Sequence, residues 1–242
     1  MNAFGLTDIG SKRSMNQDYI YVSKEPVGKL PNLFIVADGM GGHKAGDYAS
    51  RYAVTNFIEL VKNCSEDNYI SIMNAALQQM NKDLFLKSCS NIDLEGMGTT
   101  FVAAVIDNNE LYVLNVGDSR LYIAGKQLIQ ITRDHSWVEE MVARGEILRE
   151  EARTHSKKNW ITRAVGSKPE VMADFFEVHM HNDESIIMCS DGLTNMLEDA
   201  EIFSIISTRA EISQKVTDLV NKANDNGGLD NISVVVVEPY RI

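Results

Sequence analysis

Cysteine, proline and long apolar runs are all scarce in this chain of 242 residues. The three cysteines, Cys64, Cys89 and Cys189, lie far apart and form no CxxC pair, so we expect small buried side chains in a reducing compartment. The longest apolar run, residues 101–106, is far too short to cross a bilayer. Residues 1–5 have neither a basic nor an apolar signal region. These absences predict a cytoplasmic protein with no membrane partner.

Positive charge is also in short supply, because 23 Lys and Arg face 34 Asp and Glu, for a net charge of −11. This balance argues against nucleic acid and anionic membranes as partners, since both reward basic patches. It also predicts electrostatic strain wherever acids gather without a cation.

No linker, low-complexity run or internal repeat divides the chain, and there are only 4 prolines. The hydrophobic content of 44% is enough for a sizeable core. We therefore expect one domain over residues 1–242. The densely charged stretch at 145–160 predicts a mobile surface flap, with a packed but solvated helix as the alternative.

Apolar periodicity predicts both helices and strands. Helices are expected near 45–61, 69–87, 198–207 and 210–224, with a further helix capped by Asp134-His135-Ser136. Strands are expected at 3–9, 18–23, 99–106, 110–116, 120–124, 128–131, 174–179 and 185–190. The short connectors after 99–106 predict an antiparallel meander. Several of its strands are apolar on both faces, so two packed sheets with helices outside would cover them.

The most informative stretch is residues 33–43, which read LFIVADGMGGH. An apolar run suited to a buried strand stops at Asp38, and three glycines follow within four residues. Residues 186–192, IIMCSDG, repeat this arrangement, and Asp230 precedes the apolar run at 232–237. A buried strand that delivers an acid to a Gly-rich turn can hold a hard metal ion close to backbone.

Five acids lie at strand ends or in Gly-flanked turns: Asp18, Asp38, Asp118, Asp191 and Asp230. Each alone could simply form a turn. Together they make an oxygen-only set, which selects Mg²⁺ or Mn²⁺, and their convergence would be unfavourable without about two divalent cations. Two such ions about 3.5–4 Å apart could share one carboxylate and a bridging water, and could direct that water in line at a phosphoryl group.

Arg13 lies in a polar connection, residues 10–17, with no acid nearby before Asp18. It is therefore free to meet an external anion, and its planar guanidinium matches phosphate oxygens. The alternative is an ordinary solvated arginine.

The motifs taken together resemble a known family. They are Arg13 with Asn16-Gln17-Asp18, then VADGMGGH at 36–43, GTT at 98–100, GDSR at 117–120, CSDG at 189–192 and DNI at 230–232. In this order, over about residues 3–237, they resemble the bacterial metal-dependent protein phosphatases of the 2C type. The resemblance implies an α+β fold, a four-layer αββα sandwich of two mainly antiparallel β-sheets flanked by helices. It also implies hydrolysis of phosphoserine and phosphothreonine on proteins by a water that bridges two Mn²⁺ or Mg²⁺ ions.

The same resemblance implies roles for individual residues. Asp38 would bridge two metals with the Gly39 carbonyl as a further ligand, and Asp191 and Asp230 would hold one metal directly. Asp18 would hold waters of the other metal, Asp118 would join Asp191 at a third, weaker ion, and Arg13 would bind the substrate phosphate. Residues 145–160 would be the family's variable flap.

One position departs from part of the family. Animal members carry a histidine directly after the Asp-Gly pair, where it is thought to protonate the leaving group, but this chain has Met40. His43 is the remaining candidate for tuning access or helping proton transfer. For Arg120, His135 and Arg163, which also match family positions, structural ion pairs and hydrogen bonds are expected.

The expected partners are phosphoproteins, including substrates of a Ser/Thr protein kinase, and the enzyme is expected to act as a monomer. Two alternatives stay open. A relative dedicated to one regulatory partner would often lack parts of the residue set, whereas Arg13 and Asp118 are present here. A binder without turnover is disfavoured because Asp38, Asp191 and Asp230 are intact.

Overall fold

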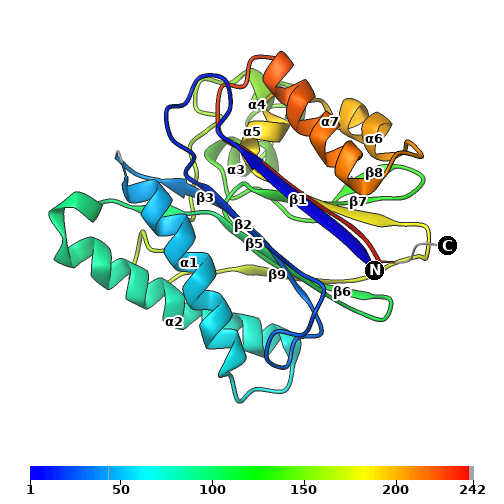
Figure 1. Cartoon of the computed structure of the whole chain (residues 1–242). Coiled ribbons are helices and arrows are strands. Elements are labelled where there is room, and N and C mark those ends of the chain that lie inside the picture. The colour runs from blue at the N-terminus through cyan, green and yellow to red at the C-terminus, as the bar shows by residue number, and fades with distance from the viewer. Residues whose placement is uncertain (43, 240–242) are drawn as a thin grey trace.

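The computed structural model describes residues 1–42 and 44–239 (Figure 1). In chain order its elements are β1 (Asn2–Asp8), β2 (Asp18–Ser23), β3 (Leu33–Met40), α1 (Ala45–Lys62), α2 (Tyr69–Ser90), η1 (Ile92–Leu94), β4 (Gly98–Thr99), β5 (Phe101–Asp107), β6 (Glu110–Val116), β7 (Arg120–Ala124), β8 (Leu128–Gln130), α3 (Trp137–Ala143), α4 (Arg149–Thr154), β9 (Asp174–His179), β10 (Ser185–Cys189), α5 (Asp191–Thr194), α6 (Asp199–Ile206), α7 (Ile212–Asp225) and β11 (Ile232–Glu238). No helix in these ranges has the length and apolar character needed to cross a membrane.

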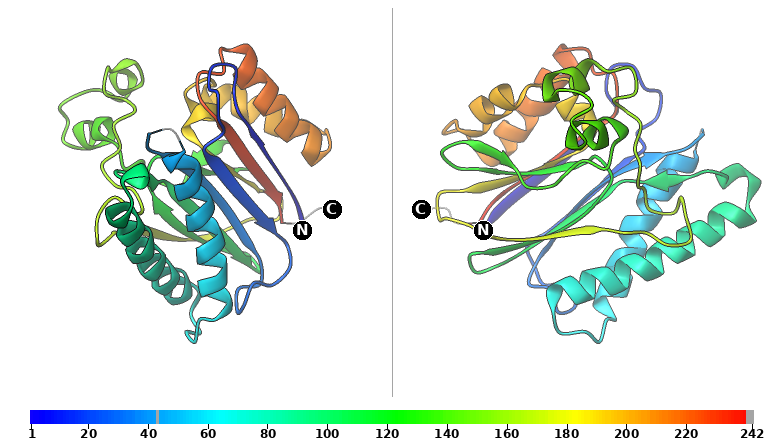
Figure 2. Two further views of the ribbon diagram at one scale, coloured as in Figure 1. Left: turned by 60° about the vertical axis from the view of Figure 1, so that its left-hand side comes forward. Right: turned by 180° about the vertical axis from the view of Figure 1, so that it is seen from behind.

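Two antiparallel sheets lie face to face between two layers of helices (Figure 2). One sheet has the order β1-β11-β10-β7-β8, and the other has the order β2-β3-β5-β6-β9, with β4 paired to β3. Helices α1 and α2 cover the outer face of the second sheet, and α6 and α7 cover the outer face of the first. The expected four-layer α+β sandwich is confirmed.

Side-chain alternation along the central strands explains why two sheets stack. Along β11, Val234 and Val236 pack toward the helices, whereas Val235 and Val237 pack against the other sheet. Because successive side chains in a strand point to opposite faces, a strand that is apolar throughout must be covered on both sides. Neighbouring sheet and helix layers supply that cover.

The expected meander over residues 99–131 is wrong at one connection. Strand β5 pairs with β6, but the other neighbour of β6 is β9, and β7 pairs with β8 and β10 in the opposite sheet. Gly117 has a φ of +105°, a conformation that glycine adopts without steric cost, and the chain there leaves one sheet for the other. The turn that carries Asp118 is therefore a crossover between the sheets.

The charged stretch at 145–160 contains the short helix α4, within which Ala152 alone is buried, and its mobility stays a prediction. The expectation for the cysteines changes in part. The cysteines are free, as expected, but only Cys189 is buried, and Cys89 is exposed.

Candidate active site

Two acids lie side by side at one end of the second sheet. Asp18 is the first residue of β2 and pairs directly with Asp38 on β3. Side chains of directly opposed residues in an antiparallel pair lie about 5 Å apart, and like charges there repel. The sheet register therefore forces two carboxylates together at this edge.

The first sheet brings its acids to the same edge. Strand β10 ends at Cys189, two residues before Asp191, and pairs with both β7 and β11. Because both of these neighbours run antiparallel to β10, their first residues lie beside its last ones. Asp118 precedes β7 by two residues, and Asp230 precedes β11 by two residues. Thus both sheets deliver acids to one place.

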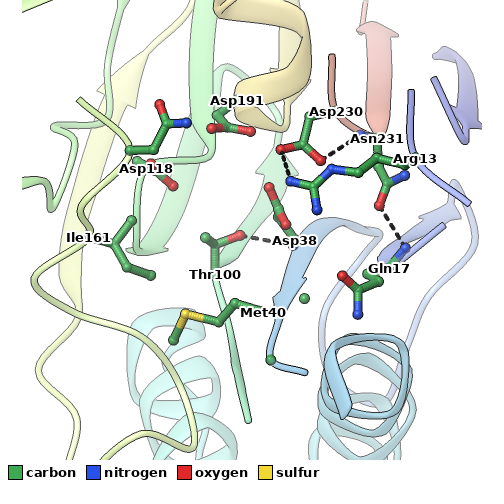
Figure 3. A pocket seen from close by; sticks show the side chains of 13 residues that line it. Arg13, Gln17, Asp38, Met40, Thr100, Asp118, Ile161, Asp191, Asp230 and Asn231 are labelled. Carbon is green, nitrogen blue, oxygen red and sulfur yellow. Dashed lines mark hydrogen bonds and ion pairs between the residues drawn. The ribbon is translucent and has the colours of Figure 1, made fainter. Parts of the chain in front are cut away.

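These acids surround a cavity of about 240 Å³. Figure 3 shows the side chains of Asp38, Asp118, Asp191 and Asp230 around a common space. Asp18 is only 2% exposed and does not line the cavity. The structure therefore brings together all five acids expected from the sequence, four on the cavity wall and one buried beside them.

The backbone of Asp38 is held from both sides. Its N–H donates to Thr100 Oγ1 (2.9 Å), and its carbonyl accepts from the Thr100 N–H (2.8 Å) and from Thr99 Oγ1 (2.9 Å). A Cβ on the next residue, Gly39, would collide with backbone oxygens of Gln17 and Gly46. Only glycine therefore lets the end of β3 approach α1 so closely.

Hydroxyl and amide groups hold two further acids. Ser190 Oγ donates to Asp18 Oδ2 (2.7 Å), and Asn195 Nδ2 donates to Asp191 Oδ2 (2.8 Å). The other oxygen of each carboxylate, Oδ1, is buried with no hydrogen-bond partner in the described residues. Buried oxygens without partners are costly, so each marks a position that suits an external ligand.

The acids perturb one another electrostatically. Burial, with added repulsion from Asp191 and Asp230, raises the pKa of Asp18 to about 7. Burial and the charge of Asp230 raise the pKa of Asp191 to about 6. The pKa values of Asp38 and Asp118 are raised well above their ordinary range, first by burial and then by neighbouring acids. Protons are therefore held at the site unless another positive charge replaces them.

This donor set fits hard divalent cations, because it consists of carboxylate oxygens and backbone. Across residues 1–42 and 44–239, no group of three or more His, Cys, Asp or Glu side chains is already arranged to hold a metal ion. Asp230 lines the cavity but is paired with an arginine, since its Oδ2 accepts a hydrogen bond from Arg13 Nη2 at 2.7 Å. A cation held by Asp230 would compete with Arg13 for the same carboxylate.

The expectation that Arg13 has no acid nearby is therefore wrong in space. Its partner, Asp230, lies 217 residues away in the sequence. The arginine nevertheless lines the cavity, and its side chain is 49% exposed. It can therefore meet an anion that enters from solvent once Asp230 has a cation as its partner.

Sequence reasoning missed the residue that holds the Arg13 loop. Asn231 is 4% exposed, and its Nδ2 donates to the carbonyls of Ile9 (2.8 Å) and Met15 (2.9 Å). Its Oδ1 accepts from the Gln17 N–H at 2.8 Å. One side chain thus joins both ends of the loop, and the DNI motif at 230–232 includes Asn231 without indicating this contact.

The structure describes some of the remaining candidate residues and not others. Met40 lines the cavity, as do Asn159 and Ile161 at the end of the charged stretch. His43 lies outside the described residues, so its role stays a prediction.

Comparisons with known proteins agree with this geometry. The family model for protein phosphatase 2C matches residues 10–229. The serine/threonine phosphatase stp of Listeria innocua is 39% identical over 245 residues, covering 98% of this chain and 96% of that protein. The crystal structure of serine/threonine phosphatase Stp1 from Staphylococcus aureus has a TM-score of 0.89 at 32% identity, covering 97% and 93% of the two chains. The catalytic domain of serine threonine protein phosphatase PstP, crystallised with two manganese ions, has a TM-score of 0.85 at 30% identity, covering 97% and 96%.

Proposed function

Because this chain belongs to the protein phosphatase 2C family and is a protein serine/threonine phosphatase, we propose that it hydrolyses phosphoserine and phosphothreonine with the help of divalent cations held by its converging carboxylates. Mn²⁺ and Mg²⁺ are the ions that this oxygen-only donor set suits. The structure of the PstP relative, which contains two manganese ions, supports the same number here.

The carboxylates would divide between the ions. Asp38, with the Gly39 carbonyl, would help to hold both ions, because acids of both sheets are close enough to its carboxylate to raise its pKa. Asp191 and Asp230 would hold one ion, and Asp18 would hold waters of the other. Asp118 would join Asp191 at a third, weaker ion.

The observation that carries the proposal is the convergence of these acids from both sheets. Register alone pairs Asp18 with Asp38, and burial raises the pKa of Asp18 to about 7. A fold that places such acids together is strained unless cations replace the protons. The unpartnered Oδ1 atoms of Asp18 and Asp191 support the same conclusion.

When bound, two divalent cations would activate a water for in-line attack on phosphorus and would neutralise charge on the phosphoryl oxygens. The residues of the chain do the rest. Arg13 would leave Asp230 and bind the phosphate oxygens through its planar fork. Three hydrogen bonds, two with Thr100 and one with Thr99, keep the backbone of Asp38 in place. With Met40 after the Asp-Gly pair, the proton donor to the leaving group stays open between His43 and water.

A phosphate-release assay on a phosphothreonine peptide tests the proposal. We expect turnover with Mn²⁺ and none after exhaustive treatment with EDTA, with recovery when Mn²⁺ is restored. Turnover of p-nitrophenyl phosphate under the same conditions distinguishes an enzyme from a protein that only binds phosphoproteins. Activity that survives complete removal of divalent ions would refute the metal-dependent mechanism.

A further inference from the structure

His135 joins the turn that carries Asp118 to the segment that returns from the charged stretch at 145–160. It is 4% exposed. Its backbone N–H donates to the Gly117 carbonyl (2.9 Å), and its own carbonyl accepts from the Thr162 N–H (2.7 Å). Its ring nitrogen Nδ1 accepts from the Gly117 N–H at 3.1 Å. Both polar backbone groups of Gly117 are therefore bonded to this histidine.

These contacts determine the tautomer of the ring. Because Nδ1 accepts a hydrogen bond from a backbone N–H, the proton of the neutral imidazole must be on Nε2. Nε2 lies 3.1 Å from Asp174 Oδ2 on β9 and 3.2 Å from Arg163 Nη1. A protonated Nε2 can donate to Asp174 but cannot accept from Arg163, so Asp174 is its partner. The other oxygen, Asp174 Oδ1, accepts from Arg163 Nη1 at 2.8 Å. Burial lowers the pKa of His135, which agrees with a neutral ring.

Gly117, in the turn beside the ring, packs closely against Thr100. A Cβ on Gly117 would lie 2.7 Å from the Thr100 side chain. Thr100 Oγ1 in turn bonds Ser119 Oγ (2.7 Å) and accepts from the Asp38 N–H. A shift of Gly117 would therefore move Asp118 and disturb the residue that holds Asp38.

The residues that follow His135 pair with the residues at the far end of the charged stretch. Ser136 forms a bridge with Ile161, and the Trp137 N–H donates to the Trp160 carbonyl at 2.8 Å. Ile161 itself lines the cavity. The histidine thus lies where the two ends of this stretch meet the turn that carries Asp118.

We infer that His135 is a positioning residue whose neutral ring holds the Gly117-Asp118 turn through Nδ1, in the tautomer set by Asp174, and so determines how tightly Asp118 holds its ion. The inference rests on the proposed role of Asp118 as a ligand of the third, weaker ion. Residues one step removed from a metal ligand typically change metal affinity about 10–100-fold when they are replaced.

Two substitutions at His135 distinguish the contributions of the two ring nitrogens to ion affinity. The side-chain oxygen of His135→Asn can take the place of Nδ1, whereas the amide of His135→Gln reaches toward Asp174 but leaves the Gly117 N–H without an acceptor. By calorimetry with Mn²⁺ alone, His135→Gln should weaken the weakest ion about tenfold and leave the tight ions unchanged. His135→Asn should stay within about threefold of wild type. Asp174→Ala, which keeps the ring, should shift the weakest ion in the same direction as His135→Gln.

Matched controls make each outcome decisive. His179→Gln alters an exposed histidine on β9, the strand that carries Asp174, and should change nothing. Nitrogen NMR of wild type should show His135 protonated at Nε2, and protonation at Nδ1 would overturn the inference. An equal loss of affinity for the weakest ion in His135→Asn and His135→Gln would also overturn it. So would an unchanged affinity in His135→Gln if Asp118→Ala loses that ion. If Asp118→Ala loses no ion either, the proposed role of Asp118 is wrong and the inference falls with it.

Discussion

Replacing Asp18 with asparagine should stabilise the protein in EDTA, although the residue belongs to the proposed metal site. Asp18 is buried, and its pKa is raised from 3.8 to about 7, first by burial and then by the charges of Asp191 and Asp230. In EDTA the folded protein must therefore take up a proton there, or keep a buried charge that the unfolded chain exposes to water.

The raised pKa of Asp18 makes the free energy of unfolding depend on pH. Between pH 3.8 and about 7 the unfolded chain has lost this proton and the folded protein keeps it, so stability falls as pH rises, by about 1.4 kcal/mol per pH unit. The accumulated cost is about 2 kcal/mol at about pH 5 and about 4 kcal/mol at about pH 8. Asparagine has nearly the same shape and no charge, and its oxygen can still accept from Ser190.

Thermal unfolding in EDTA measures this effect. The Tm of Asp18→Asn should exceed that of wild type by roughly 10 °C at about pH 8 and by much less at about pH 5. Added Mn²⁺ should remove or reverse the advantage, because the ion whose waters Asp18 would hold stabilises wild type more than the variant. Asp183→Asn is the control, since Asp183 is an exposed acid in the turn after β9. A wild-type stability that does not depend on pH in EDTA, or equal effects of the two substitutions, would refute the reasoning.

Three further predictions concern catalysis. Asp38→Asn should lower phosphate release at least about a thousandfold at every Mn²⁺ concentration, because Asp38 is the carboxylate proposed to hold both ions; recovery at high Mn²⁺ in the same assay would contradict this. Arg13→Met should raise KM for a phosphothreonine peptide about 10–100-fold, because the phosphate loses the arginine. It should also tighten Mn²⁺ binding measured by calorimetry, because Asp230 loses its partner. An unchanged KM would exclude phosphate binding by Arg13. Asn231→Asp places a carboxylate oxygen against the carbonyls of Ile9 and Met15. Steady-state kinetics should therefore show a KM several-fold higher, about the effect of losing one buried hydrogen bond. A KM like that of wild type would refute this positioning role.

Local structure could be predicted well from the sequence. The strands at 18–23, 110–116, 120–124 and 174–179 begin and end where their apolar pattern and flanking turn residues place them. Strand propensity and turn chemistry act over a few residues, so they can be read along the chain. The positions of the acids at strand ends follow from the same local signals.

Long-range pairing could not be predicted in the same way. A connector of three residues at 117–119 favours a hairpin, yet Gly117 sends the chain to the opposite sheet. Nothing near Arg13 in the sequence indicates its ion pair with Asp230. The ring contacts of His135 and the three bonds of Asn231 likewise depend on which strands meet in space, which periodicity does not contain.

Helix α4 shows a different limit. Its six residues bury only Ala152, so the helical period leaves almost no apolar signal there. The charged side chains that dominate the segment describe its exposure to solvent and not its backbone conformation.

Anomalous scattering from crystals grown with Mn²⁺ would locate the ions relative to the carboxylates. We expect two strong manganese peaks in the cavity with the Asp38 carboxylate in contact with both, Asp230 beside one of them, and Arg13 released from Asp230. Manganese bound elsewhere, or an Asp38 that contacts neither ion while Arg13 stays paired with Asp230, would contradict it.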